Sequence, residues 1–190
     1  IGVGLTQVKG ALSSVMVLNG DDSAFYKPKT ILDVVKKHLN SGSTLTFVTL
    51  KVANPQGLGR VVRKNGQAVC IVEEKDANFQ QKRIQEVNDG LYVFKYAWLS
   101  GNLNKVRISP KSGEFYLVDL VKIAVSQGQK VITYELKDPN EWHGINTPEE
   151  LLAANRKLAR RIHIMGAAGA GAAAVAGIAK GQDFKVSGCD

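Results

Sequence analysis

The stretch that decides the fold is GLGRVVRKNGQAVCIVEE, residues 57–74. Two runs of mainly β-branched and apolar residues flank Asn65-Gly66, and this dipeptide is the strongest short signal for a two-residue hairpin turn. A Gly-x-Gly sequence precedes the first run, and two glutamates end the second. The sequence therefore predicts an antiparallel hairpin that follows a glycine loop and ends in acidic side chains.

Strands and helices alternate on either side of this hairpin. Pro28 can begin a helix in which Ile31, Leu32, Val35 and Leu39 fall on one face, and Gly42 ends it. Thr147 is the expected N-cap of a later helix. The remaining predicted strands are 15–18, 44–52, 88–96 and 129–136, and the remaining predicted helices are 76–87 and 112–128. This alternation predicts an α/β fold with a largely parallel sheet, into which the hairpin is inserted.

Composition narrows the class of protein. The apolar fraction of 44% and the charged fraction of 22% are ordinary for a globular chain. The net charge of +8 is dispersed and is not interleaved with aromatic residues, so we expect no nucleic-acid partner. No signal peptide is visible, and the apolar run 166–179 is too short and too rich in glycine to span a bilayer. A soluble, cytoplasmic protein with no membrane partner is expected, with Cys70 a reduced, buried thiol.

Several polar residues and glycines stand at loops or strand ends, where ligands bind. Asp21 follows a strand, and a carboxylate there can hold Mg²⁺ or simply face solvent. The Gly57-Leu58-Gly59 sequence can let backbone approach a ligand, or it can be only a loop. Each of three further residues also has a structural explanation. Glu73 can be one of two solvated charges at a strand end, Asn88 can serve a turn, and Asn146 can belong to the segment that leads into the Thr147 cap.

Taken in order, these segments resemble one family, the sugar-nucleotide pyrophosphorylases. The segments are strand–GD, GLGR, IVEEKDA, EVNDGLYVF, GEFYLVDL and HGINTPEEL, over about residues 13–158. The spacings agree as well: 14 residues separate Gly59 from Glu73, 15 separate Glu73 from Asn88, and 58 separate Asn88 from Asn146. The similarity is greatest to the N-acetylglucosamine-1-phosphate uridylyltransferase branch. It implies a Rossmann-like, glycosyltransferase-A-like mixed sheet with a hairpin insertion.

The resemblance also implies roles for individual residues. Asp21 and Asn146 match the residues that hold the catalytic Mg²⁺ in this family. The Gly59 backbone and the side chains of Glu73 and Asn88 match groups that contact the hexosamine, and Asn146 lies in the substrate site too. The implied reaction joins UTP to N-acetylglucosamine 1-phosphate, giving UDP-N-acetylglucosamine and pyrophosphate.

Some features depart from the family pattern. The glycine-rich loop whose arginine and lysine grip the triphosphate has no counterpart here, and Asp89 stands where the relatives usually carry threonine. The acetyltransferase half of the bifunctional enzymes has no counterpart either. We therefore expect the isolated chain to be catalytically inactive.

The closing segment, RIHIMGAAGAGAAAVAGIAKGQDFKVSGCD, reads as a strand, a glycine loop, a helix and a strand. It resembles the start of a Mur ligase, the UDP-N-acetylmuramate–L-alanine type, in which Gly166, Gly169 and Gly171 match the loop that approaches the UDP group. A glycine loop before a helix suits a phosphate. The expected organisation is a nucleotidyltransferase domain at 1–159 and a partial βαβ unit at 160–190.

Two other interpretations stay open at the sequence level. The chain can belong to a protein that acts as the ligase, or it can be a non-catalytic remnant that binds sugar nucleotides. The sequence does not fix the sugar, the base or the oligomeric state. Both resemblances place the chain in peptidoglycan precursor synthesis.

Overall fold

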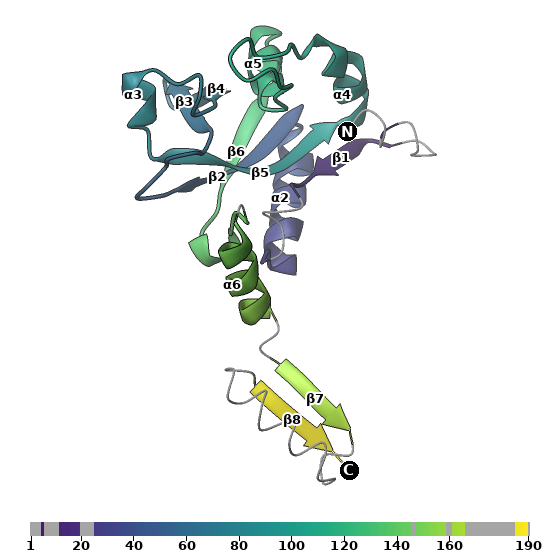
Figure 1. Cartoon of the computed structure of the whole chain (residues 1–190). Coiled ribbons are helices and arrows are strands. Elements are labelled where there is room, and N and C mark those ends of the chain that lie inside the picture. The colour runs from purple at the N-terminus through teal and green to yellow at the C-terminus, as the bar shows by residue number, and fades with distance from the viewer. Residues whose placement is uncertain are drawn as a thin grey trace. The chain divides into compact units, whose positions relative to one another are not determined.

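The computed structural model describes residues 5, 12–19, 25–145, 147–158, 161–165 and 185–189. The chain divides into two compact units, Ile1–Trp142 and His143–Asp190, which are described separately below. Figure 1 shows the sheet of the first unit with its helices, and the short strand pair of the second.

The first unit is built on one mixed sheet. Its path runs β4-β3-β5-β2-β6, and β1 pairs with β5 off this path. The strands are β1 (Ser14–Val17), β2 (Leu45–Lys51), β3 (Arg60–Lys64), β4 (Gln67–Val72), β5 (Glu86–Lys95) and β6 (Val131–Glu135). The mixed α/β class predicted from the sequence is confirmed.

The expectation of a largely parallel sheet is wrong for the described residues. Only β2 and β6 pair in parallel among the strands of the first unit that the structure describes. The long strand β5 runs antiparallel to β1, β2 and β3. The Asn65-Gly66 turn reverses the chain, and β4 and β5 both run in this reversed direction, so β5 lies antiparallel to its neighbours β2 and β3.

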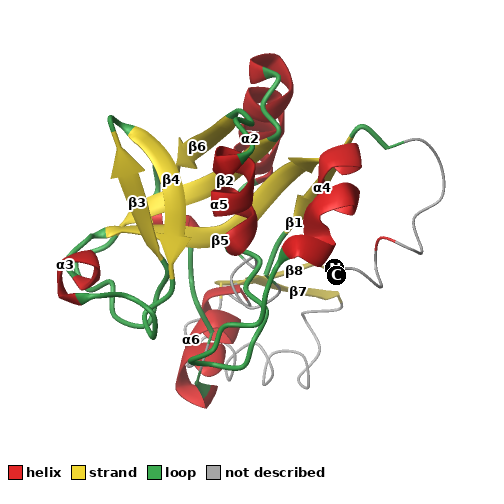
Figure 2. Ribbon diagram, turned by 90° about the horizontal axis from the view of Figure 1, so that it is seen from above, coloured by secondary structure: helices red, strands yellow, loops and turns green. Residues whose placement is uncertain are grey.

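Helices cover both faces of the sheet, as the views in Figures 1 and 2 show. On one face, Val34 of a long helix packs with Val48, Leu50 and Leu91. On the other, Leu99, Leu120 and Val121 pack with the sheet residues Phe47 and Phe94. The helices are α2 (Pro28–Ser41), α3 (Phe79–Lys82), α4 (Tyr96–Asn102) and α5 (Asp119–Ser126), with short 3-10 turns η1 (Leu103–Lys105) and η2 (Pro139–Glu141).

Helix α2 begins at Pro28 and ends at Gly42 as predicted, but its buried face differs from its apolar face. Gly42 has a φ of 62°, the left-handed conformation typical of a helix end. The buried residues are Thr30, Val34 and His38, whereas Leu32 and Leu39 are 56% and 55% exposed. Ile31 of the predicted face does pack against the core, but the buried stripe is rotated toward the polar Thr30 and His38, so the apolar pattern alone indicated the face only in part.

Two predicted helices are shorter in the structure, and one helix was not predicted. Of residues 76–87, only α3 is helical, and a reciprocal cap between Asn78 and Gln81 closes this single turn. Of residues 112–128, only α5 is helical. Helix α4 was missed because its segment, YAWLSGN, continues the aromatic pattern of strand β5 and contains a glycine.

The central hairpin forms as predicted. Asn65 and Gly66 have φ angles of 50° and 78°, the positive pair that a two-residue turn between twisted strands requires. Arg60 lies opposite Val72 and Val62 opposite Cys70, and the register then shifts by one residue between Val62 and Arg63. This β-bulge adds one residue to β4 and so decides which residues of the two strands lie opposite each other.

The second unit contains one helix and a pair of strands. Helix α6 (Pro148–Leu158) begins with the predicted cap: the Glu150 N–H donates to Thr147 Oγ1 at 3.1 Å, and the Thr147 N–H donates to the Glu150 carboxylate at 2.9 Å. Strands β7 (Arg161–Met165) and β8 (Lys185–Cys189) pair in parallel. The helix predicted between them lies outside the described residues. No helix in the described part of the chain is long and apolar enough to cross a membrane.

Candidate functional site

The structure brings together the three predicted sugar-binding residues, Gly59, Glu73 and Asn88. The other predicted site residues lie outside the described residues: Asp21, Asn146, Gly166, Gly169 and Gly171. The structure therefore shows how these three residues lie, while their sugar-binding role, the metal site and the second glycine loop stay predictions.

Gly59 contacts both of its predicted partners. The Asn88 N–H donates to the Gly59 carbonyl at 2.9 Å. A β-carbon placed on Gly59 would lie 3.1 Å from Oε1 of Glu73 and 2.9 Å from Cγ2 of Ile71. The third closest atom, Cδ of Glu73, would be at 3.4 Å. Only glycine fits beneath this carboxylate without displacing a neighbour, which explains the residue type at position 59.

The alternation of side chains along the strands explains this grouping. Thr49 lies opposite Asn88, two residues from the core residue Phe47, so Asn88 faces the side of the sheet covered by α5. Ile71 is part of the same core cluster, and Glu73 follows it by two residues. The hairpin and β5 thus present Gly59, Glu73 and Asn88 on one face, although 29 residues of sequence separate the first from the last.

Glu73 lines a cavity of about 170 Å³ between β4 and α5. Three carboxylates and one lysine give this cavity an acidic lining. The lining residues are Cys70, Ile71, Val72, Glu73, Asp76, Tyr116, Val118, Asp119 and Lys122. An acidic cavity suits a neutral, hydroxyl-rich group, because ionised carboxylates accept hydrogen bonds from hydroxyls and repel phosphate.

Electrostatics single out Glu73 among these groups. Burial, and then the charges of Asp76 and Asp119, raise the pKa of Glu73 above its ordinary value, while Arg60 opposes the shift. Burial also raises the pKa of Asp119. Ionised carboxylates kept partly from water and close to one another are unfavourable, and a bound ligand with several hydroxyls would supply hydrogen-bond donors to Glu73.

Asn88 also has an unused acceptor. Its Oδ1 is buried and has no hydrogen-bond partner in the part of the chain that the structure describes. A buried amide oxygen without a donor is energetically unfavourable by about 1–3 kcal/mol. Such a group is expected where a ligand completes the hydrogen bonding.

Cys70 is a free thiol on the wall of the cavity, and it is half-buried. Burial raises the pKa of the Cys70 thiol, so it stays protonated at neutral pH. Cys70 was predicted to be buried, and the structure shows it only half-buried.

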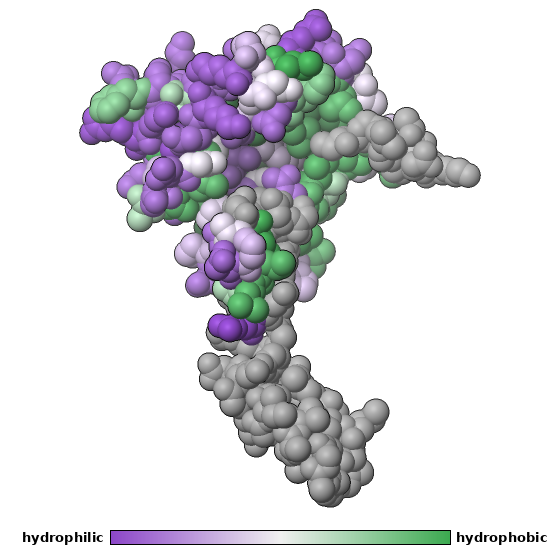
Figure 3. Space-filling view, viewed as in Figure 1, coloured by the Kyte–Doolittle hydropathy of each residue, from purple (hydrophilic) through white to green (hydrophobic). Residues whose placement is uncertain are grey.

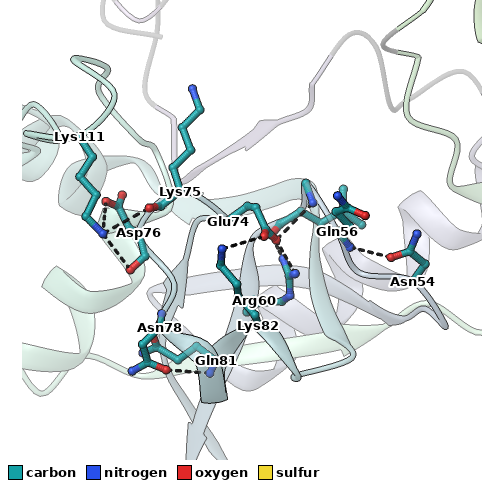
Figure 4. Close-up of polar contacts among 12 residues, drawn as sticks. Asn54, Gln56, Arg60, Glu74, Lys75, Asp76, Asn78, Gln81, Lys82 and Lys111 are labelled. Carbon is teal, nitrogen blue, oxygen red and sulfur yellow. Dashed lines mark hydrogen bonds and ion pairs between the residues drawn. The ribbon is translucent and has the colours of Figure 1, made fainter.

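Glu74, next to Glu73, has a different environment, which Figure 4 shows. It lies on the reverse face of the hairpin and forms ion pairs with Arg60 at 2.5 Å and Lys82 at 3.4 Å. The hydrogen bond from Arg60 lowers the pKa of Glu74. The two glutamates are therefore not one solvated pair: one lines the cavity, and the other is neutralised behind it.

Sequence reasoning missed Arg60, which is only 1% exposed. It directly follows Gly59 and begins β3 opposite Val72, two residues before Glu74. The hairpin turn at Asn65-Gly66 already places residue 60 near residues 71 and 72, so pairing across the hairpin was the signal that could have indicated this ion pair.

The surface around the hairpin is polar. In Figure 3, hydrophilic residues predominate over β3, β4 and α3. At the end of β4, Lys111 forms an ion pair with Asp76 at 3.6 Å and donates to the Lys75 carbonyl at 3.3 Å, contacts that Figure 4 also shows. Within the described ranges, no group of three or more His, Cys, Asp or Glu side chains is arranged to hold a metal ion.

Comparison with known proteins finds similar sequences among bacterial proteins named GlmU. The chain is 35% identical over 148 residues to the bifunctional protein GlmU of Desulfitobacterium hafniense, an alignment that covers 78% of this chain and 32% of the relative. It is 34% identical over 160 residues to GlmU of Corynebacterium aurimucosum, covering 84% of this chain and 33% of the relative. The chain thus spans about a third of the length of the curated relatives it matches.

The fold is shared with a solved structure. A Bacillus anthracis protein assigned as a glucose-1-phosphate thymidylyltransferase, crystallised with sucrose, superposes with a TM-score of 0.59 at 19% identity. The superposition covers 75% of this chain and 53% of that protein. The family model for nucleotidyl transferases matches residues 4–161, which include the hairpin, the cavity and strand β5. The chain therefore belongs to the nucleotidyl transferase family.

Proposed function

We propose that this chain forms the sugar-binding part of a sugar-1-phosphate nucleotidyltransferase that makes UDP-N-acetylglucosamine. The substrates would be UTP and N-acetylglucosamine 1-phosphate, and the product would serve peptidoglycan precursor synthesis in the cytoplasm. The relatives named GlmU and the IVEEKDA and EVNDG segments favour this branch over the related glucose-1-phosphate enzymes.

One observation carries the proposal: Gly59 contacts both Asn88 and Glu73, and Glu73 lines an acidic cavity. The Asn88 amide oxygen has no hydrogen-bond partner among the described residues, and the Glu73 carboxylate is buried near other carboxylates. The absence of a side chain on Gly59 leaves room for the Glu73 carboxylate above the backbone. A hexosamine offers hydroxyl and amide donors that match these acceptors. Sites built to hydrogen-bond a hydroxyl discriminate strongly against ligands that lack it, because the site's own groups are then left unpaired.

The proposed reaction is a nucleotidyl transfer. An oxygen of the sugar 1-phosphate attacks the α-phosphorus of the triphosphate, a new P–O bond forms, and the bond to pyrophosphate breaks. Such reactions depend on holding the two reactants in line and on neutralising the phosphoryl oxygens. In this scheme Gly59, Glu73 and Asn88 bind and orient the sugar, and the acidic lining directs the phosphate out of the cavity.

Mg²⁺ is the proposed cofactor, and Asp21 and Asn146 are the residues that would hold it. Carboxylate and amide oxygens suit this hard cation. When bound, the ion would neutralise charge on the phosphates.

Isothermal titration tests the proposed ligand. The 190-residue chain should bind UDP-N-acetylglucosamine and N-acetylglucosamine 1-phosphate more tightly than UDP-glucose. Glu73→Ala and Asn88→Ala should each weaken binding by about tenfold or more. Asp33→Ala, which removes an exposed ion pair with Lys29 on α2, is the control that should bind normally. Unchanged affinity in both site variants would refute the proposed sugar site.

Turnover is a separate question. Because the triphosphate-gripping loop has no counterpart in these 190 residues, we expect the isolated chain to bind sugar without producing pyrophosphate. Ordinary turnover of UTP and N-acetylglucosamine 1-phosphate with Mg²⁺ would contradict this. The second unit has no assigned activity, and a phosphate-binding role for Gly166, Gly169 and Gly171 stays a prediction.

A further inference from the structure

The glycine loop before β3 is held from the reverse face of the hairpin. The Gly57 N–H donates to Oε2 of Glu74 at 3.3 Å. The Arg60 guanidinium donates to the Leu58 carbonyl and, at 2.5 Å, to the same Glu74 oxygen. Successive loop residues are thus tied to one ion pair, which joins the start of β3 to the end of β4 (Figure 4).

The burial of Arg60 indicates that stability alone does not explain this ion pair. The Arg60 side chain is 2% exposed and the Glu74 side chain 26%. The Arg60 Nε has no hydrogen-bond partner in the described part of the chain. Burying a guanidinium is unfavourable, and an apolar pair of similar volume often gives equal or greater stability. The arginine is therefore better explained by the geometry that its rigid, forked donors impose.

That geometry is transmitted to the candidate sugar site through the backbone. Side chains alternate along a strand, so Gly59 and Glu73 lie on one face of the hairpin while Arg60 and Glu74 lie on the other. Arg60 directly follows Gly59, and Glu74 directly follows Glu73, which lines the cavity. A shift of the loop relative to the end of β4 would therefore change the distance between Gly59 and Glu73.

We propose that the Arg60–Glu74 ion pair is a positioning pair that fixes the Gly57–Gly59 loop for sugar binding. The inference rests on the proposed function, because it assigns the pair to the same sugar site. The pair does not touch the sugar. It holds the Gly59 backbone against Glu73, so that the acceptors of the site are placed before the ligand arrives.

A double substitution separates positioning from stability. Arg60→Met/Glu74→Met removes both charges and keeps apolar volume, so the unfolding free energy should stay at or above the wild-type value. The affinity for UDP-N-acetylglucosamine should nevertheless fall by about tenfold, and hydrogen exchange of the Gly57 amide should become faster. A purely structural pair would lower stability and affinity together or would change neither.

The matched control uses a second Arg–Glu pair, which joins the hairpin to β5. Arg63 on β3 donates to Glu86 on β5 at 2.6 and 2.7 Å. Arg63→Met/Glu86→Met removes an ion pair of the same kind that makes no contact with the glycine loop. It should therefore leave both the sugar affinity and the hydrogen exchange of the Gly57 amide unchanged.

The outcomes are distinguishable. Wild-type affinity and wild-type Gly57 exchange in the Arg60/Glu74 variant would overturn the positioning role. A wild-type chain that binds neither UDP-N-acetylglucosamine nor N-acetylglucosamine 1-phosphate would overturn the proposed function, and Gly57 exchange would still decide whether the pair holds the loop. If the double variant does not fold, Glu74→Gln takes its place. It keeps an acceptor for Gly57 but loses the charge, and unaltered affinity in it would equally overturn the inference.

Discussion

The Glu73 carboxylate lies 3.1 Å from the point that a β-carbon on Gly59 would occupy. Gly59→Ala must therefore displace Glu73 or Ile71, and Ile71 is a core residue only 5% exposed. We expect a loss of about 1–3 kcal/mol in the unfolding free energy, as is typical of overpacking. We also expect sugar affinity to fall by at least about tenfold. Urea unfolding and titration calorimetry measure the two effects.

Gly42→Ala is the control for this substitution. Gly42 has a positive φ of 62° but nothing within 4 Å of a new β-carbon, so alanine introduces backbone strain without crowding. It should lower stability while leaving sugar affinity intact. Equal affinities in the Gly59→Ala and wild-type chains would show that the close approach to Glu73 has no part in binding.

Glu73→Gln should stabilise the chain at neutral pH while weakening sugar binding. The folded-state pKa of Glu73 is raised by burial and by Asp76 and Asp119, so the folded protein binds this proton more tightly than the unfolded chain. The stability that protonated Glu73 contributes is therefore lost as pH rises from the pKa of the unfolded chain, near 4.3, through the pKa of the folded state. Thermal unfolding should show the variant above wild type at pH 7, with the difference vanishing below about pH 4.3.

Asp76→Asn provides the check on that explanation. It removes one of the repelling charges but leaves Glu73 buried, and it also removes the ion pair with Lys111, so it should reproduce at most part of the stabilisation at pH 7. A Glu73→Gln chain less stable than wild type at neutral pH would mean that the ionised carboxylate is well compensated, contrary to the proposed donor-poor site.

The hairpin turn gives a simpler test of local structure. Gly66 has a φ of 78° and open space around its Cα, so Gly66→Ala introduces strain alone. A non-glycine residue in this region is disfavoured by about 1–2 kcal/mol, and that is the loss in unfolding free energy we expect. Lys64→Ala, at an exposed strand position beside the turn, is the control and should change stability by less than about 0.5 kcal/mol. An equal loss in both variants would argue against the turn geometry.

The parts of the fold that depend on local chemistry could be predicted from the sequence. Asn65-Gly66 identified the turn, Gly42 the end of α2, and Thr147 the start of α6, because each signal acts within a few residues. The buried face of α2 could not be predicted from apolar spacing. Thr30 hydrogen-bonds Glu141, far along the chain, and His38 contacts the hydroxyls of Ser43 and Thr46 just beyond the helix. Such hydrogen bonds do not appear in a hydropathy pattern.

The candidate site, too, could be predicted only in part from the sequence. The spacing of Gly59, Glu73 and Asn88 could be recognised through the family resemblance, and the structure places all three together. The different roles of Glu73 and Glu74 could not be read from two adjacent identical residues. They follow from the register of the hairpin, and the bulge between Val62 and Arg63 that sets this register has no evident sequence signal.

Buried His38 should make stability sensitive to mild acid. Its Nδ1 lies 2.9 Å from Oγ1 of Thr46 and 3.1 Å from Oγ of Ser43, and the residue is 1% exposed. Burial, and then the charge of Lys95, lower the pKa of His38, so the folded state keeps the imidazole neutral. As pH falls below about 6.5, the unfolded chain takes up this proton first. Stability should therefore fall, by at most about 1.4 kcal/mol per pH unit for this single group.

Urea unfolding between pH 7.5 and 5 measures this effect. Trp98 and Trp142 both lie in the first unit and report on its unfolding by fluorescence. His38→Gln removes the titrating group but keeps a side chain that can hydrogen-bond the two hydroxyls, so its stability should depend less on pH over this range. The difference between the two curves isolates His38 from the carboxylates, which titrate in both chains. Parallel curves for the variant and the wild type would show that His38 is protonated without penalty in the folded state, and the neutral hydrogen-bonded imidazole would be refuted.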